Sequence, residues 1–200
     1  AHSDIQRRRP ASLTMVTSQR LHPTTLESDR LMLRELSPSD AEDIFSYASK
    51  PEVTRYVFWN PHVNIEDTHR YILAFAKPRT VAWAMQHKDT NRVIGIVFLH
   101  SINPHKRTAE IAYNVSPQVW REGYATEAAR RVLEHCFTET NLDTIEGTCM
   151  TDHDASARVL EKAGLTFQTI KAKTRRKNGV AYDLKYFTLT RTRWLEARTA

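Results

Sequence analysis

Apolar residues recur along the chain at two spacings, and these spacings divide it into strands and helices. Short continuous or alternating apolar runs that end at turn residues predict strands, and apolar positions three and four residues apart predict helices. The expected strands are 31–36, 81–88, 92–102, 108–116, 144–151, 165–173 and 181–190. The expected helices are 37–49, a short turn within 51–62, then 65–76, about 123–138, 155–164 and a last turn within 191–197.

The connections between these elements indicate a single mixed sheet. The turns at 89–91 and 103–106 are short enough to join three successive strands as an antiparallel meander. Asn178-Gly179, between two strand-like runs, predicts a β-hairpin. No repeat or internal linker divides the sequence. We therefore expect one α/β domain over residues 26–200, preceded by a basic, disordered tail over residues 1–25.

Composition narrows the class of protein. The chain of 200 residues is 40% hydrophobic and 26% charged, as in soluble globular domains. No apolar run approaches the roughly 18 residues that span a bilayer, so we expect no membrane segment. Cys136 and Cys149 are too few for a disulfide framework, which favours a reducing, cytoplasmic setting.

The net charge of +6 favours anionic partners. Part of the basic excess lies in 7–9 and in the turn 171–179, which could equally be solvated surface. No helix-turn-helix, RNA-recognition or zinc-finger pattern accompanies this charge, so no dedicated nucleic-acid domain is expected. His100, His105 and His153 lack metal-ligand spacing, and the cysteines form no C-x-x-C pair, so no metal site is expected either.

The segment VSPQVWREGYATEAARRVLEH at 115–135 places one of only five glycines where a helix is expected to begin. Gly123 lets a ligand approach the backbone without meeting a Cβ atom, and Ala125 keeps the next side chain small. The first amides of a helix are unpaired and, with the helix dipole, favour an anion such as a phosphate. Arg121 adds a cation beside them. The alternative is a helix start packed tightly by small residues, and the pattern alone does not decide between the two.

Three motifs in a fixed order carry a resemblance to a known family. They are AEIAYNV at 109–115, WREGYATEA at 120–128 and HDASARVLEKAGL at 153–165. Together they resemble the acetyl-CoA-binding core of the GNAT acetyltransferase superfamily, and more narrowly its RimJ/RimL-type N-acetyltransferase branch. The similarity covers about residues 26–195.

The resemblance implies a fold and a cofactor site. The fold is α/β: a GNAT-like central mixed, mostly antiparallel sheet, flanked by helices and splayed between its fourth and fifth strands, here 108–116 and 144–151. The co-substrate is acetyl-CoA, and no metal is implied. Its pantetheine arm would hydrogen-bond to the main chain of the fourth strand, and its pyrophosphate would lie on the glycine loop. The residues implied to bind it are Asn114, Val115, Arg121, Glu122, Gly123, Tyr124, Ala125, Thr126 and His153.

Two of these residues depart from the family pattern. Arg121 stands where the loop usually has Gly, so it has less backbone freedom but could pair with a phosphate. His153 stands where the family commonly has Asn, three residues before Ser156, and could still hydrogen-bond to the pantetheine arm. These departures leave open a catalytically silent acyl-CoA-binding module as the alternative to an enzyme.

The implied reaction is direct attack of a neutral primary amine on the acetyl thioester within a ternary complex. Glu110 is the candidate base, acting directly or through water; the alternative is a structural carboxylate paired with a basic residue. The amide of Val115 or its neighbour would stabilise the oxyanion. Ser156 resembles the family serine near the sulfur and would protonate the thiolate; the alternative is an ordinary N-cap or first-turn serine.

The acceptor site is the least readable part of the sequence. Phe58 and Trp59 resemble the family's substrate-side loop, although they could equally cap the core. The loops expected to build the site are 58–64, 103–107 and 175–180. The basic turns NPHKR at 103–107 and TRRKNG at 174–179 hint at an acidic acceptor such as an acidic protein N-terminus, while small-molecule amines stay open. The oligomeric state is also not readable, although the edge of the terminal hairpin could pair two copies as a homodimer.

Overall fold

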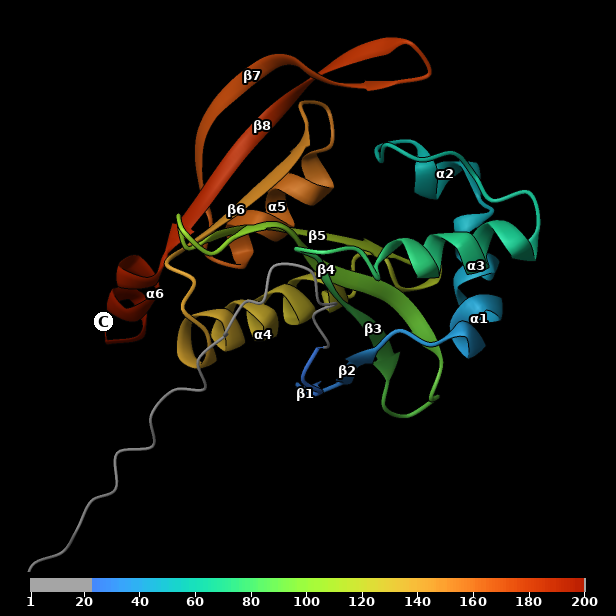
Figure 1. Ribbon diagram of the computed structural model, residues 1–200, viewed down its shortest axis with the longest axis horizontal. Helices are drawn as coiled ribbons and strands as arrows, with labels where there is room; N and C mark the ends of the chain where they lie inside the picture. Colours follow the sequence, from blue (N-terminus) through green and yellow to red (C-terminus); the bar gives the residue numbers. More distant parts are fainter. Residues whose placement is uncertain (1–22, 200) are drawn as a thin grey trace, which may run out of the picture.

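The computed structural model describes residues 23–199. Residues 1–22 of the expected tail lie outside this range, and residues 23–25 are in neither helix nor strand. The described residues form an eight-stranded sheet with the order β1-β2-β3-β4-β5-β6-β8-β7 (Figure 1). The strands are β1 (Leu26–Glu27), β2 (Leu31–Glu35), β3 (Val81–His87), β4 (Val93–Asn103), β5 (Thr108–Val115), β6 (Thr144–Met150), β7 (Thr166–Lys177) and β8 (Val180–Thr190).

Helices of very different lengths connect these strands. They are η1 (Pro38–Asp40), α1 (Ala41–Ala48), α2 (Pro51–Thr54), α3 (Ile65–Ala74), η2 (Pro117–Val119), α4 (Tyr124–Glu139), α5 (Asp154–Lys162) and α6 (Arg191–Thr199). The helix expected over 37–49 is in fact η1 followed by α1. A capping box between Ser37 and Asp40 fixes the short first turn, in which the side chain of each bonds to the backbone of the other. Within residues 23–199, no helix is long and apolar enough to cross a membrane.

The sheet carries a hydrophobic core on each face. Along β3, Trp83 and Met85 pack into one core, while Ala82 and Ala84 pack into the other, as the alternation of side chains in a strand requires. The first core includes the buried faces of α4 and α5, and the second includes those of α1 and α3. The sheet is therefore covered on both sides (Figure 1).

All neighbouring strands pair antiparallel except β5 and β6, which are parallel. Their register runs from Thr108–Thr144 to Ile111–Gly147 and ends there, although both strands continue. The second half of β5 thus has a partner only in β4. This confirms the mostly antiparallel sheet with a splay between the strands expected as fourth and fifth.

Candidate functional site

A cleft of about 1000 Å³ opens where β5 and β6 separate. Its walls come from the segment between α2 and α3, from β4, β5 and β6, from the loop before α4, from α5 and from the terminal hairpin. The cleft brings together all the catalytic, cofactor-binding and substrate-binding residues expected from the sequence except Glu122. Those that line it are Phe58, Trp59, Glu110, Asn114, Val115, Arg121, Gly123, Tyr124, Ala125, Thr126, His153 and Ser156.

The main chain of β5 offers hydrogen-bonding groups to this cleft. Ser116 N–H donates to the Ile94 carbonyl of β4 at 2.8 Å, and successive residues of a strand point their amides to opposite sides. The Val115 N–H therefore points away from β4, toward the gap where pairing with β6 has ended. The main-chain groups of Asn114 face β4 instead, opposite Ile96.

The side chain of Asn114 is buried and joins three elements. Its Oδ1 accepts a hydrogen bond from the Tyr47 hydroxyl at 3.0 Å, and its Nδ2 donates to the Tyr71 hydroxyl at 3.0 Å. Burial raises the pKa of both tyrosines, so both stay protonated at neutral pH. Asn114 thereby links α1 and α3 to β5 next to the cleft.

The loop before α4 has two residues in the left-handed backbone region. Arg121 has a φ of 68° and Gly123, the N-cap of α4, has a φ of 88°. No side chain caps the helix at Gly123, so the first amides of this 16-residue helix stay available to a ligand. A backbone of this kind occurs in loops that curve around an anion.

Arg30, to which no sequence motif pointed, anchors this loop. Its Nη1 donates to the Glu122 carbonyl at 3.0 Å, and its guanidinium lies 3.9 Å from the centre of the Tyr124 ring. Its backbone N–H and Nε both donate to the Glu127 carboxylate, at 2.8 and 2.7 Å. Burial alone would raise the pKa of Glu127, but the hydrogen bonds from Arg30 and Ser28 lower it. Glu127 therefore holds Arg30, and Arg30 holds the loop.

His153 lies at the start of α5 and faces the α2–α3 segment. Its ring stacks on Tyr56, with the ring centres 4.3 Å apart and the planes 11° from parallel. Burial lowers the pKa of His153, against the opposing effects of Asp152 and Asp154, so the ring is neutral at neutral pH. In this position it closes one side of the cleft and offers a neutral hydrogen-bonding group.

Ser156 lies in the first turn of α5, but it is not the N-cap, which is His153. The Tyr113 hydroxyl donates to the Ser156 carbonyl at 3.0 Å and lies 3.0 Å from its Oγ. Burial raises the pKa of Tyr113, which keeps the phenol protonated. Tyr113 was not singled out in the sequence, although it lies within the AEIAYNV motif.

Glu110 is mostly shielded, with 19% of its side chain exposed. Its Oε1 accepts a hydrogen bond from Thr148 on β6 at 2.5 Å, and its Oε2 lies 3.8 Å from His100 Nε2. Burial and the nearby charge of Arg175 lower the pKa of His100, although Glu110 opposes them. His100 is then neutral at neutral pH. Among residues 23–199, Glu110 forms no ion pair with a lysine or arginine.

Phe58 and Trp59 line the cleft between α2 and the terminal hairpin. Phe58 packs edge-on against Tyr182, with the ring centres 6.3 Å apart, and the Arg175 guanidinium lies 4.4 Å from the centre of the Phe58 ring. Trp59 packs 5.2 Å from Tyr71 and borders the second core. Each aromatic therefore lines the cleft, and Trp59 also covers the core.

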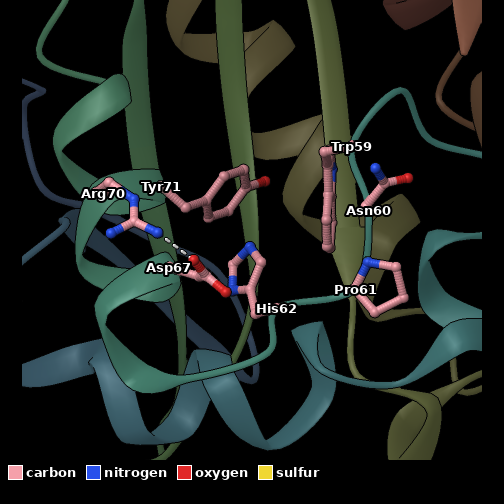
Figure 2. A pocket seen from close by; sticks show the side chains of 7 residues that line it. All are labelled: Trp59, Asn60, Pro61, His62, Asp67, Arg70 and Tyr71. Carbon is pink, nitrogen blue, oxygen red and sulfur yellow. Dashed lines mark hydrogen bonds and ion pairs between the residues drawn. The ribbon is translucent and has the colours of Figure 1, made fainter. Parts of the chain in front are cut away.

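A second, smaller hollow of about 390 Å³ lies on this side of the molecule. Figure 2 shows Trp59 and Tyr71 on opposite sides of it, with the His62 ring between them and Arg70 paired with Asp67. Trp59 and Tyr71 line both hollows, so they form the wall between them. His62 is fixed by its Nδ1, which lies 2.8 Å from the Thr68 hydroxyl.

Residues 30–166, which contain the splay, the glycine loop and all of α5, match the family model described as an acetyltransferase (GNAT) domain. The chain belongs to the GNAT acetyltransferase family. It is accordingly an acetyl-CoA-dependent N-acetyltransferase. Among residues 23–199 of this GNAT acetyltransferase, no group of three or more His, Cys, Asp or Glu residues could hold a metal ion.

Known proteins of similar sequence or structure agree with this assignment. The GNAT acetyltransferase is 34% identical over 172 residues to the uncharacterized N-acetyltransferase YoaA of Bacillus subtilis (strain 168), covering 84% of this chain and 97% of the other. Its fold is similar to a GNAT acetyltransferase from Bacillus anthracis, with a TM-score of 0.77, 24% identity and coverage of 84% and 99%. It is also similar to the ribosomal L7/L12 alpha-N-protein acetyltransferase RimL in complex with coenzyme A, with a TM-score of 0.75, 16% identity and coverage of 84% and 98%.

Proposed function

We propose that this GNAT acetyltransferase transfers the acetyl group of acetyl-CoA to a primary amine, on a protein N-terminus or a small molecule, by direct attack in a ternary complex. The observation that carries the proposal is the direction of the Val115 N–H. It points away from β4 into the gap between β5 and β6, and Glu110 lies on the same strand. The motif WREGYATEA, together with the RimL-like fold, supports placement in the RimJ/RimL-type branch.

The donor side of the cleft suits the shape and charge of acetyl-CoA. The pantetheine arm would lie along β5 in place of a strand partner and accept a hydrogen bond from the Val115 N–H, which has no partner among residues 23–199. The pyrophosphate would lie on the amides at the start of α4, with Arg121 as the nearby cation. The residues proposed to hold the donor are Asn114, Val115, Arg121, Glu122, Gly123, Tyr124, Ala125, Thr126 and His153; Glu122 acts through its main chain, which Arg30 fixes.

The chain's own groups can carry the proton transfers of the reaction. Glu110 would take the proton of the acceptor ammonium, directly or through water. As the C–N bond forms, the Val115 N–H would stabilise the oxyanion. When the C–S bond breaks, Ser156 would give a proton to the thiolate and recover one from water. The Tyr113 hydroxyl, 3.0 Å from Ser156 Oγ, would hold the serine side chain in place.

A cysteine acyl-enzyme is poorly supported by the two cysteines of the chain. Burial raises the pKa of Cys136 to about 12 and that of Cys149 to about 11. At neutral pH both are thiols, whereas an acyl-enzyme needs a thiolate nucleophile. Direct transfer is the mechanism that the site favours, and two free cysteines also fit a cytoplasmic protein.

The test is thiol release from acetyl-CoA in the presence of N-terminal peptides and small amines. The variant Glu110→Gln keeps the shape of the side chain and removes the base. We expect it to lower kcat by about 10²- to 10⁴-fold near neutrality, with partial recovery at higher pH, where the amine is already neutral. Glu52→Gln, an exposed carboxylate that also lines the cleft, is the matched control and should keep its activity.

Two results would contradict the proposal. Acetyl-CoA that stabilises the protein but is consumed with none of the amines would favour the silent acyl-CoA-binding module. Full activity in Glu110→Gln would mean that this carboxylate is structural, held by Thr148 and not used as a base.

A further inference from the structure

The terminal hairpin bends over the acceptor end of the cleft because of a bulge in β7. Lys171 pairs with Leu184 and Arg175 pairs with Tyr182, so residues 172–174 lie opposite the single residue Asp183. Within the bulge, Lys173 has a φ of 53° and its N–H donates to Asp183 Oδ1 at 2.8 Å. Such a bulge bends a strand and increases its twist. Figure 1 shows the hairpin curving beyond β6 and α5.

The tip of the hairpin is attached to the end of α2 and to the segment between α2 and α3. Lys177 Nζ donates to the Thr54 carbonyl. The side-chain amides of Asn178 and Asn60 form hydrogen bonds of 3.2 and 3.4 Å with each other. The hairpin and this segment therefore meet above the acceptor end of the cleft and form a roof over it.

Arg175 is the cation that this roof presents to the cleft. It lines the cleft, and its guanidinium lies over Phe58 with a distance of 4.4 Å to the ring centre. A guanidinium stacked on an aromatic ring keeps its N–H edges free for a planar anion. Among residues 23–199 no carboxylate pairs with Arg175, whereas the neighbouring Arg176 donates to the Gly179 carbonyl of its own turn.

The charges along the cleft are predominantly positive. Its two acidic residues are Glu52 and Glu110, and its basic residues are Arg55, Lys77, Arg121, Arg158, Lys162 and Arg175. Arg121, Arg158 and Lys162 lie on the loop before α4 and on α5, next to the proposed phosphate site. The other three lie on the segment around α2 and α3 and on the hairpin, so excess positive charge also surrounds the acceptor.

We propose that Arg175 binds a carboxylate of the acceptor, so that the enzyme selects amines that carry a carboxylate a few atoms away and disfavours polyamines. This inference rests on the proposed function. The amine would lie near Glu110, and the carboxylate would lie under the roof. His100 lies 3.8 Å from Glu110 and is close enough to Arg175 to be affected by its charge. Such a carboxylate can be the α-carboxylate of a free amino acid or the side chain of Asp or Glu at the start of a peptide.

The experiment compares kcat/KM for acceptors matched in size that differ only in the carboxylate. One pair is a peptide that begins with aspartate and the same peptide beginning with asparagine. A second pair is a free amino acid and its amide. Spermidine serves as the polycationic comparison. We expect the carboxylate to raise kcat/KM by roughly tenfold or more, as for a charge-assisted hydrogen bond. The pair that shows the effect identifies the source of the carboxylate.

The variant Arg175→Gln should abolish this preference while the KM for acetyl-CoA stays unchanged. Arg176→Gln removes the same charge one residue away and should keep the preference. Equal turnover of both members of each pair, preference for spermidine, or an unchanged preference in Arg175→Gln would each overturn the inference.

A binding measurement separates this inference from the proposed function. Calorimetry of the same acceptors with protein saturated in CoA, which has no acetyl group to transfer, needs no catalysis. If no amine releases thiol from acetyl-CoA, the proposed function fails. Binding that depends on the carboxylate and is lost in Arg175→Gln would still support the role of Arg175. Binding that does not depend on Arg175 would overturn that role, and so would the absence of binding.

Discussion

Arg121 adopts a left-handed backbone conformation, which costs a residue with a Cβ atom roughly 1–2 kcal/mol relative to the right-handed region. The family usually has Gly here, and Gly would adopt the same conformation freely. The strain is retained at the loop that curves around the proposed phosphate site. If the Arg121 guanidinium pairs with a phosphate, the free energy of that contact offsets the cost of the backbone conformation, but only while the phosphate is bound.

The variant Arg121→Gly should separate these two effects. Loss of strain, partly offset by the greater freedom of Gly in the unfolded chain, should raise the free energy of unfolding by up to about 1 kcal/mol without ligand. Loss of the cation should weaken CoA binding by roughly three- to tenfold. Denaturant unfolding measures the first quantity, and calorimetry with CoA measures the second.

Arg79 provides the control for this prediction. It has a similar φ of 61° but does not line the cleft, so Arg79→Gly should change stability in the same direction and leave CoA binding unchanged. An Arg121→Gly variant with unaltered CoA affinity would show that the guanidinium does not contact the phosphates.

At the scale of the element, the hairpin shows how a local irregularity shapes the site. The turn at Asn178-Gly179 is readable from the sequence, because both residues favour the positive φ values of 48° and 81° that they adopt. The bulge at 172–174 is not readable, because the sequence pattern ends the expected strand at 173 and gives no sign that β7 continues to Lys177. The bulge is stabilised by the Asp183 side chain, ten residues away in sequence, which accepts a hydrogen bond from the Lys173 N–H.

Removal of that acceptor should loosen the roof without unfolding the sheet. We expect Asp183→Ala to cost about 1 kcal/mol locally, to speed hydrogen exchange of the amides in 172–180, and to raise the KM for the amine acceptor more than that for acetyl-CoA. Hydrogen-exchange mass spectrometry and steady-state kinetics measure these effects. The amides of β6 serve as an internal control, and equal changes in both regions would contradict a local role.

Two elements at the ends of the domain differ from the sequence-based prediction. The two-residue strand β1 was not predicted, because two residues cannot show an alternation. The final helix was expected as a single turn but extends over nine residues, Arg191–Thr199. Most of its residues are exposed, but Trp194 packs on Phe137 of α4 with the ring centres 5.6 Å apart.

At the scale of the whole molecule, four histidines make stability depend on pH. Burial is the main cause that lowers the pKa of His62, His100, His135 and His153. The unfolded chain binds protons at these positions near pH 6.5, whereas the folded chain resists them. The free energy of unfolding should therefore fall as the pH drops below about 6.5 toward the lowered folded values. Urea unfolding at pH 7.5 and pH 5.5 measures this.

One substitution tests the histidine origin of this dependence. His153→Asn introduces the residue common in the family and removes one of the four contributions, so the fall in stability between these two pH values should be smaller. Identical pH dependence in the variant and in the wild type would contradict the assignment for His153.

The sequence by itself determined the order of the elements, the antiparallel meander, the terminal hairpin and the glycine loop before α4. Each of these depends on residues close together in the chain: periodicity within a strand or helix, turn residues, or a glycine that can adopt a positive φ. The family motifs are also short continuous segments, so the residues expected at the donor site can be named without the tertiary structure.

Only the tertiary structure decided how far β5 and β6 pair, and hence that the Val115 amide is left facing the gap. It also decided the contacts that complete the site: Arg30 with Glu127, 97 residues apart, Tyr113 with Ser156, 43 apart, and Asn60 with Asn178, 118 apart. None of these pairs has a local pattern, because each arises when separate elements pack on the same sheet. The same packing places Arg175, which pairs with no carboxylate among residues 23–199, at the proposed acceptor end.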